Sequence, residues 1–247
     1  MKEVPISLSR TVRKETLTGA TAFYVSSPSG EELFLTSAPV AGEGPAAVLA
    51  RAAQFVRANG FEVISQDVLG LRNRDRSATQ MLAEAFGDVS WPVTWIEPGD
   101  NDRQDMFGTQ IWAVSGTRVK RLERNGRVTG SVIENDAVEY LRLGGVVPES
   151  GTDAQGQQAR NVLEQMESQF RSLGLSFRDV ARTWLYADRI LAWYGDFNKV
   201  RTTFFEERNV FNGLMPASTG IGAANESGRA LVAGAIAMRP KLPETKC

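Results

Sequence analysis

Hydrophobic and polar residues alternate in some segments of this chain and recur at helical spacing in others. In the first half, residues 21–25 and 32–37 lie on either side of the turn signal Pro28-Ser29-Gly30 and predict a hairpin. A helix is predicted from Pro45, because proline suits the first helical position, and Gly60 follows its end. Residues 61–69 then predict a strand.

A second helix and two further strands complete the first half. Ser77 and Gln80 have the spacing of a capping box, which predicts a short helix that reaches Phe86 and stops at Gly87. Residues 91–97 and 109–115 are predicted as strands.

The second half shows a similar series of elements. Asn125-Gly126 is a strong hairpin signal and joins residues 118–124 to residues 127–133. A strand is predicted over 138–147, followed by a long amphipathic helix that starts with a capping box of Thr152 and Gln155 and ends at Gly174. Further elements are a strand over 180–187, a helix over 192–207, and strands over 219–224 and 229–238.

The two series predict an internal duplication, with units at residues 1–116 and 117–247. Each unit is expected to be an α+β unit, a mixed β-sheet with two helices packed on one face, because right-handed crossovers return both helices to the same side. The other face of each sheet needs cover. We expect either the other copy, sheet against sheet, or further subunits that close a barrel.

Composition excludes several classes of function. The chain has 247 residues with a net charge of −1, which argues against a nucleic-acid partner. It has no histidine, and its one cysteine is Cys247, so imidazole catalysis, a Ser-His pair and a zinc site are not expected, and we predict no metal and no cofactor. Without a signal peptide or a long apolar run, a cytoplasmic protein with no membrane partner is expected.

Several stretches of the second half resemble a known group, the Rid superfamily, also called YjgF or reactive-intermediate deaminase proteins. They are Leu143-Gly144-Gly145-Val146-Val147-Pro148, Asp153-Ala154-Gln155 and Phe177-Arg178-Asp179-Val180-Ala181-Arg182-Thr183. The resemblance implies tandem Rid-like units of the chorismate-mutase-like trimer type. It also implies trimer or pseudo-trimer association through sheet faces, with ligand clefts between units.

Within that group, the second half is similar to the amino-terminal part of chorismatases, hydrolases that cleave the enolpyruvyl ether of chorismate. The similar stretches are Ala181-Arg182-Thr183-Trp184-Leu185-Tyr186, Tyr194-Gly195-Asp196-Phe197-Asn198 and Met215-Pro216-Ala217-Ser218-Thr219-Gly220-Ile221-Gly222. This resemblance implies a small-molecule carboxylate as the ligand. It also implies that an acid/base glutamate comes from a further unit, which would begin after Pro240, whereas the chain given ends at Cys247.

The sequence departs from the deaminases of the group at the positions that their chemistry needs. Their Pro-Ala-Arg-Ser stretch holds the substrate carboxylate, but this chain has Pro216-Ala217-Ser218-Thr219 and, in the first half, Trp91-Pro92-Val93-Thr94-Trp95. Residues 230–237 of the last strand contain no carboxylate. These departures argue against enamine or imine deaminase activity, which remains an alternative to ligand binding and to a structural or regulatory role.

Arg182, Trp184 and Tyr186 form the first part of the candidate site. They alternate along a predicted strand, so their side chains point to one face. A guanidinium group beside two aromatic rings suits a carboxylate attached to a flat ring. The alternative is sheet packing, with Arg182 paired to a neighbouring acid.

The second part of the candidate site follows the turn at Pro216. Ser218, Thr219, Gly220 and Gly222 lie in a strand whose glycines indicate close approach, either of a ligand or of another backbone. Without a histidine, nucleophilic catalysis by the two hydroxyls is not expected. Arg201, on the predicted helix over 192–207, is a candidate ligand contact whose alternative is a solvated helical arginine.

Overall fold

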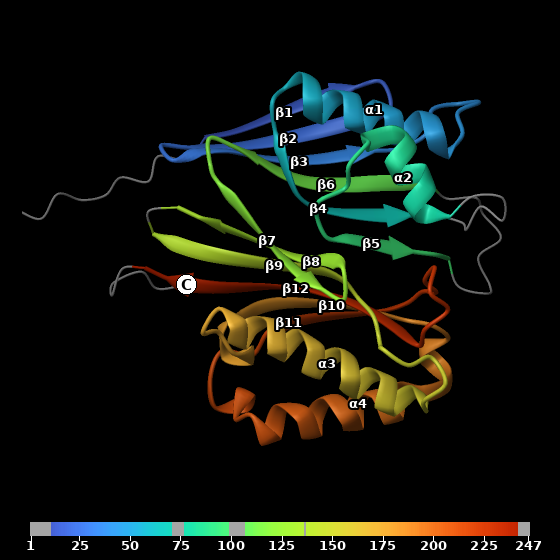
Figure 1. Ribbon diagram of the computed structural model, residues 1–247, viewed down its shortest axis with the longest axis vertical. Helices are drawn as coiled ribbons and strands as arrows, with labels where there is room; N and C mark the ends of the chain where they lie inside the picture. The colour runs from blue at the N-terminus through green and yellow to red at the C-terminus, as the bar shows by residue number, and fades with distance from the viewer. Residues whose placement is uncertain (1–10, 71–76, 99–106, 136, 242–247) are drawn as a thin grey trace, which may run out of the picture.

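The described part of the chain forms two six-stranded sheets and four α-helices (Figure 1). The computed structural model describes residues 11–70, 77–98, 107–135 and 137–241. The two sheets lie between two helical layers, with α1 and α2 above the first sheet in Figure 1 and α3 and α4 below the second. No helix in these described ranges has the length and apolar character needed to cross a membrane.

The first sheet has the strand order β1-β2-β3-β6-β4-β5. Only the pair β4–β5 is parallel, and the other neighbours are antiparallel. The elements of this unit are β1 (Thr11–Leu17), β2 (Ala20–Ser27), β3 (Gly30–Ser37), α1 (Pro45–Ala58), β4 (Glu62–Leu69), α2 (Ala78–Phe86), β5 (Val93–Ile96) and β6 (Gly108–Ser115).

The second sheet has the order β11-β10-β12-β9-β8-β7. When it is followed from β7, each strand has the same position as its counterpart in the first sheet. Its elements are β7 (Val119–Arg124), β8 (Arg127–Glu134), β9 (Val138–Val146), α3 (Gln155–Ser172), β10 (Val180–Ala187), α4 (Ile190–Glu207), β11 (Ala217–Gly222) and β12 (Leu231–Pro240), with short 3₁₀ turns η1 (Phe177–Asp179) and η2 (Val210–Asn212). The predicted duplication and α+β class are confirmed. The division of the chain at residues 116 and 117 stays a prediction.

Two sequence expectations need correction. The first unit contains the additional strand β1, which pairs with β2 and supplies the counterpart of β7. Thr152 does not cap α3: the residue before the helix is Ala154, which makes no side-chain cap, and the Thr152 hydroxyl pairs with that of Ser150. The capping box of Ser77 and Gln80, in contrast, forms as predicted.

The larger apolar core lies between the second sheet and its helices. Phe170, Phe177 and Phe204 are fully buried there, and their rings meet edge to face with centroids 5.1 Å apart. Edge-to-face packing adds about 1 kcal/mol per pair to the burial of apolar area. This core fixes α3 and α4 on the outer face of the sheet.

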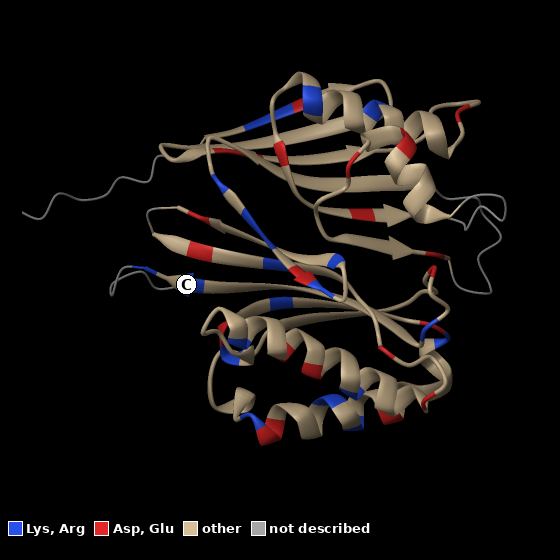
Figure 2. Ribbon diagram, viewed as in Figure 1, with Lys and Arg blue, Asp and Glu red and all other residues tan. Residues whose placement is uncertain are grey.

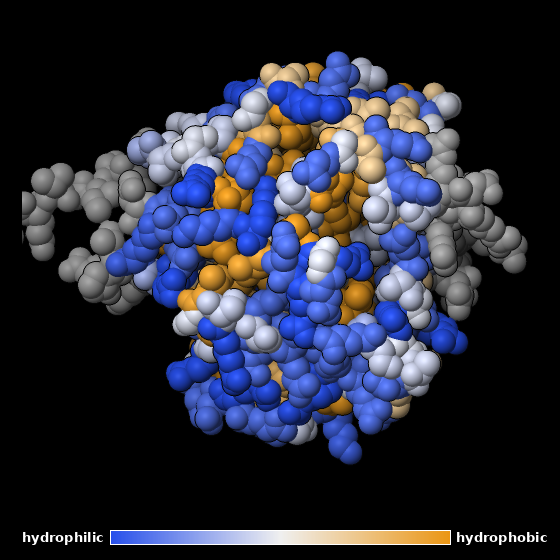
Figure 3. Space-filling model, in the orientation of Figure 1, coloured by the Kyte–Doolittle hydropathy of each residue, from blue (hydrophilic) through white to orange (hydrophobic). Residues whose placement is uncertain are grey.

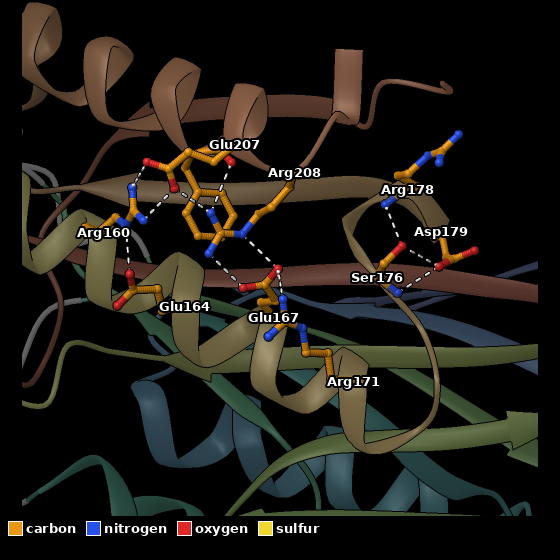
Figure 4. A network of polar contacts seen from close by, with 10 residues as sticks. Arg160, Glu164, Glu167, Arg171, Ser176, Arg178, Asp179, Glu207 and Arg208 are labelled. Carbon is orange, nitrogen blue, oxygen red and sulfur yellow. Dashed lines mark hydrogen bonds and ion pairs between the residues drawn. The ribbon is translucent and has the colours of Figure 1, made fainter. Parts of the chain in front are cut away.

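Both acidic and basic residues lie on α3 and α4 (Figure 2), and their side chains join α3 to the end of α4 (Figure 4). Arg208 donates to both oxygens of Glu167 at 2.7 and 2.8 Å, and its guanidinium carbon lies 3.5 Å from the centre of the Phe204 ring. Arg160 donates to both oxygens of Glu207, at 3.1 and 2.6 Å. The helical layer is therefore fastened by two forked pairs as well as by apolar packing.

The two sheets meet where β4 and β5 of the first unit pack on β8, β9 and β12 of the second. Ser131 donates to the carbonyl oxygen of Ile64 at 2.7 Å, and Thr94 accepts from the backbone N–H of Gly145 at 3.1 Å. Gly145 has a φ of +63°, and a Cβ there would lie 2.2 Å from the Val93 carbonyl oxygen. Glycine is thus required for the close approach of the two units.

The inner face of the first sheet is open on the side of β2 and β3. Phe23 on β2 and Phe34 on β3 are neighbours across the strands, and each is 42% exposed. In Figure 3, apolar surface is exposed mainly in the upper half of the view, over the first unit, whereas the helical layer of the second unit is mostly hydrophilic. The second sheet therefore covers only part of the inner face of the first.

Candidate functional site

Six side chains gather on the inner face where the two units meet, and we name them the inner-face cluster. They come from four strands of both sheets. The members are Asp67 on β4, Arg142 on β9, Arg182, Trp184 and Tyr186 on β10, and Thr219 on β11.

The register of the second sheet sets these positions. Arg182 lies opposite Ile236, which lies opposite Arg142, so the two arginines share a row across β10, β12 and β9. On β10, the residues that alternate with Arg182, Trp184 and Tyr186 face the helices. Leu185 is one of them and belongs to the outer core. The three β10 side chains therefore point to the inner face, as strand alternation predicts.

Gly234 leaves room for the centre of the cluster. It lies opposite Trp184, and a Cβ at this position would be 3.0 Å from Nη1 of Arg142 and 2.8 Å from the Leu143 carbonyl oxygen. The Arg142 guanidinium crosses this space and lies over the indole, its carbon 4.4 Å from the ring centre. A glycine inside a strand here serves the close approach of a side chain.

Arg142 is a fully engaged cation. It is 6% exposed and donates from Nε to Ser65 at 3.2 Å, from Nη1 to the Leu143 carbonyl at 3.0 Å and from Nη2 to Asp67 at 3.2 Å. A buried charge of this kind is tolerated because its donors are satisfied and a carboxylate neutralises it. Arg142 therefore joins the two units and holds the indole in place.

Arg182 differs from Arg142 in its exposure and in its lack of a carboxylate partner among the described residues. Its side chain is exposed, and it donates from Nη2 to the Thr219 hydroxyl at 2.8 Å. Its guanidinium carbon lies 5.1 Å from the centre of the Trp184 ring. No carboxylate within the described part of the chain forms an ion pair with Arg182. Thr219 and Trp184 therefore orient this arginine, and its remaining N–H groups are available to a ligand.

Tyr186 contributes a neutral hydroxyl to the cluster. Burial raises its pKa to about 12, and the negative charge of Asp67 acts in the same direction, while Arg142 and Arg182 oppose the shift. The hydroxyl therefore keeps its proton at neutral pH and remains a hydrogen-bond donor.

Several predicted site residues lie elsewhere. Ser218 faces the helices, where its Oγ accepts from Thr183 at 2.9 Å. A Cβ at Gly220 or Gly222 would lie 3.7 or 3.1 Å from Ile190 of α4, so these glycines serve helix packing. Of the predicted segment, Thr219 joins the inner-face cluster.

Arg201 does not join it. Arg201 lies on α4, on the opposite side of the second sheet, with its guanidinium carbon 5.9 Å from the centre of the Phe197 ring. Arg201 is thus a helical arginine on the outer layer, as in the alternative, but its side chain is partly buried rather than fully solvated.

Arg142 and Asp67 are not among the site residues that the sequence predicts. Each carried a signal. Arg142 is a charged residue between Leu141 and Leu143 in a strongly apolar strand, and Asp67 ends an alternation with Ser65 in β4. Polar residues at these positions indicate that this face of the strand does not belong to an ordinary hydrophobic core.

A separate cleft of about 800 Å³ lies between the units, next to the cluster. Val232, the neighbour of Tyr186 across the strands, is one of its lining residues, but Arg182 and Thr219 are not. Its other walls come from α2 with β5 and from the ends of β8 and β9, with Trp91, Trp95 and Arg127 among them. The expected inter-unit cleft therefore exists, while the predicted ligand contacts lie on the adjacent inner face.

No three histidine, cysteine, aspartate or glutamate side chains of the described residues come together as metal ligands would. The chemistry of the inner-face cluster is that of anion binding, aromatic stacking and hydrogen-bond donation.

Comparison with solved structures finds several that are similar to this chain. A solved structure of a chorismatase is similar over 92% of this chain and 79% of its own, with a TM-score of 0.63 and 13% sequence identity. A YjgF-family protein from Neisseria meningitidis covers 51% of this chain and 98% of its own, at 17% identity and a TM-score of 0.41. E. coli TdcF, solved with bound serine, covers 47% and 91%, at 21% identity and a TM-score of 0.39.

No protein-family model matches the sequence, and no curated protein is significantly similar to it. At the identities above, the likeness to solved structures concerns the fold. The resemblance that the motifs indicate is confirmed at the level of the fold: the chain shares with a chorismatase an architecture of tandem α+β units.

Proposed function

We propose that this protein binds a small carboxylate metabolite, of the chorismate-like or enolpyruvyl-like kind, at the inner-face cluster between its two units. One observation carries the proposal. Arg182 is a cation held in place by Thr219 and by the Trp184 ring, yet it has no ion-pair partner in the described chain. An arginine with free donors is the usual partner of a carboxylate, which it binds through two parallel hydrogen bonds.

The aromatic neighbours suit an unsaturated or ring-bearing ligand. Trp184 is partly exposed beside Arg182, and Tyr186 keeps a neutral hydroxyl near both arginines. Flat groups gain stacking energy on an indole, and a ligand hydroxyl or ether oxygen finds a donor in the phenol. The likeness in fold to a chorismatase supports the same class of ligand.

Calorimetric titration tests the proposal. Chorismate, pyruvate and analogues of 2-iminobutyrate are titrated into the wild-type protein and into Arg182→Ala. Loss of a bidentate pair is expected to weaken binding about 10- to 100-fold. Arg201→Ala is the matched control, because it removes the same side chain from the helical layer and should leave affinity unchanged.

Two outcomes would end the proposal. One is the absence of heat with every carboxylate at millimolar concentration. The other is binding that Arg182→Ala leaves unaltered.

The open sheet faces favour a second candidate function, that of a structural or regulatory subunit in an assembly. Val12, Phe23 and Phe34 expose large apolar side chains on β1 to β3. Contiguous apolar surface of this kind is typical of contact sites between proteins. Light scattering distinguishes this candidate, since a strict monomer that captures no partner would exclude it.

Imine deaminase activity is not favoured. In the first unit, Thr94 stands in the stretch that would need the arginine, and its hydroxyl is engaged by Gly145. In the second unit, Ser218 is turned toward Thr183 on the helical side. A normal rate of 2-aminoacrylate breakdown would contradict this interpretation.

A further inference from the structure

The contact between the two units joins unlike faces of the repeated fold. The β4–β5 side of the first sheet packs on the β8–β9 side of the second. Because β4 and β5 correspond to β10 and β11, and β8 and β9 to β2 and β3, the chain keeps one unused face of each kind. The β10–β11 face exposes Arg182 and Ile221, and the β2–β3 face exposes Phe23 and Phe34. A contact between unlike faces can be repeated from copy to copy.

The strand registers show which residues correspond. In the first sheet, Ser65 on β4 and Phe34 on β3 lie in one row, separated by one residue of β6. In the second sheet, Arg182 on β10 and Arg142 on β9 lie in one row, separated by one residue of β12. The register of β4 and that of β10 shift at the same step before these rows. Ser65 therefore corresponds to Arg182, and Phe34 corresponds to Arg142.

The next inward-facing residues of the two strands, Asp67 and Trp184, correspond as well. Within the chain, Arg142 donates to Ser65 and to Asp67, each at 3.2 Å. A second copy placed by the same relation would bring its Phe34 onto the β10 counterparts of these two acceptors. One counterpart is a guanidinium and the other is an indole.

The exchanged residues match each other chemically. At the internal contact a guanidinium meets a hydroxyl and a carboxylate, whereas at the repeated contact a phenyl ring would meet a guanidinium and an indole. Phenylalanine attracts both groups, through cation–π interaction and aromatic packing. Phe34 is 42% exposed, and its ring stacks on Trp112 with centroids 5.8 Å apart, so it is held in place before any docking.

A charged pair is repeated with the same signs. Arg121 on β7 binds Glu62 on β4 at 3.1 Å across the internal contact. By register, Arg121 corresponds to Lys14 on β1, and Glu62 corresponds to Asp179, directly before β10. Lys14 is exposed. The repeated contact would therefore again join a cation to a carboxylate.

We propose that a second copy of this chain docks with its β2–β3 face on the β10–β11 face of the first, and that its Phe34 completes the carboxylate site at Arg182. This inference rests on the proposed function. The Arg182 guanidinium then lies between the Trp184 ring and the phenyl ring of the second copy. A guanidinium stacked on both faces still donates from its edge, where a carboxylate binds in the same plane.

Docking and ligand binding support each other. Arg182 is exposed in the single chain, and the second copy removes it from water. A buried cation without an anion is unfavourable, and a carboxylate that neutralises it relieves that cost. The ion pair is in turn stronger where water is excluded. By linkage, the carboxylate strengthens association by the same factor by which association strengthens binding of the carboxylate.

Sedimentation equilibrium with and without benzoate tests this coupling. Benzoate serves as a flat carboxylate probe, and benzamide is its neutral match. Benzoate is expected to strengthen association of the wild type about tenfold, whereas benzamide should leave it unchanged. Arg182→Ala should remove the effect of benzoate, because no cation is then buried at the contact.

Two pairs of variants test the docking face, with circular dichroism to establish that each is folded. Phe34→Ala is expected to weaken both association and benzoate binding about tenfold or more. Phe211→Ala is its control, since Phe211 is equally exposed but lies in η2 on the helical layer. Lys14→Glu sets a carboxylate against Asp179 and should weaken association. Arg13→Glu makes the same change of charge on the opposite face of β1, over the Tyr24 ring, and should not.

Mixing two variants shows whether Phe34 acts from another copy. Phe34→Ala keeps an intact β10–β11 face, and Arg182→Ala keeps an intact β2–β3 face. Each variant alone is expected to bind benzoate at least about tenfold more weakly than the wild type. Their mixture should regain tight sites, because Arg182 of one variant meets Phe34 of the other.

The outcomes separate this inference from the proposed function. A wild type that stays a monomer at every concentration, with and without benzoate, refutes the docking. Association that benzoate leaves unaltered, or a mixture that binds no better than its components, refutes the part of the second copy in the site. In either case, benzoate binding that still depends on Arg182 leaves the ligand site of the single chain standing. If no benzoate binding depends on Arg182, the proposed function and the coupling fail together.

Discussion

At the residue scale, the site depends on two positions that hold its geometry without touching the proposed ligand. Gly234 leaves the space that Arg142 crosses, and Arg142 fixes the Trp184 ring against which Arg182 lies. Packed interiors tolerate little added volume, so a methyl group at the glycine has nowhere to go.

Gly234→Ala is predicted to destabilise the protein by about 1–3 kcal/mol, because the new Cβ meets a backbone carbonyl as well as the guanidinium. Urea unfolding followed by tryptophan fluorescence measures the change. Gly220→Ala is the matched control: its Cβ would make an ordinary contact at 3.7 Å, and its stability should stay within about 0.5 kcal/mol of the wild type. Equal losses in both variants would contradict the role given to Gly234.

Tyr186 predicts a pH dependence. Its folded pKa of about 12 lies above the ordinary value of 10.0, so the protonated phenol stabilises the fold below pH 10, and this contribution is lost as the pH rises from 10 toward 12. Absorbance titration of the four tyrosines should show a component that ionises near pH 12 and is absent from Tyr186→Phe. A variant with an unaltered titration curve would show that another tyrosine supplies this component.

At the element scale, α3 and α4 are fastened through Glu167, which two arginines share. Arg208 binds both carboxylate oxygens and is largely buried, whereas Arg171 reaches one oxygen at 3.1 Å from a side chain that is 70% exposed (Figure 4). The contributions of a largely buried pair and of an exposed pair to stability can thus be compared at the same carboxylate, that of Glu167.

Arg208→Ala is predicted to cost about 2–3 kcal/mol of stability, since it leaves a buried carboxylate without its main partner and uncovers the Phe204 ring. Arg171→Ala should cost less than about 0.5 kcal/mol, because exposed pairs are screened by water and salt. Thermal unfolding at equal ionic strength measures both. The interpretation fails if the two variants lose the same stability.

Most elements could be predicted because their signals are local. The Asn125-Gly126 turn occupies left-handed backbone at φ values of 50° and 73°, and Pro45 begins α1 as its fixed φ suggests. β1 is not predicted, because it is an edge strand without a buried residue and its pattern carries little apolar alternation. Thr152 had the spacing of a cap, but the helix begins after Ala154.

The site was less predictable than the fold. Strand alternation was enough to place Arg182, Trp184 and Tyr186 on one face. Asp67 and Arg142 are 75 residues apart and meet because two sheets pack, which no local signal reports. Ser218 was assigned to the site from its place in a motif, although its pairing with Thr183 turns it to the other face.

At the scale of the whole molecule, two units cover each other only in part. The contact between them combines the hydrogen bonds of Gly145 and Ser131 with two apolar clusters drawn from both units, while the β1 to β3 side of the first sheet stays open. Association of further units through this side, expected from the family resemblance, stays a prediction.

Phe23→Lys and Phe34→Lys together test that association. If the open face is a contact surface, the wild type sediments as a multiple of the single chain, and the double variant sediments as a monomer, because buried lysines oppose docking. Leu191→Lys is the control, since Leu191 is 91% exposed on α4 and its replacement should leave the mass unchanged. A monomeric wild type would remove the contact role from this face.

The proposed function requires that a carboxylate binds at Trp184 and Arg182 and not in the neighbouring cleft. The five indole N–H signals, assigned by single Trp→Phe variants, report on both places during an NMR titration with benzoate. We expect the Trp184 signal to move with increasing benzoate and Arg182→Ala to abolish the movement. Movement of the Trp91 and Trp95 signals with Trp184 unchanged would place the ligand in the cleft and refute the proposed site.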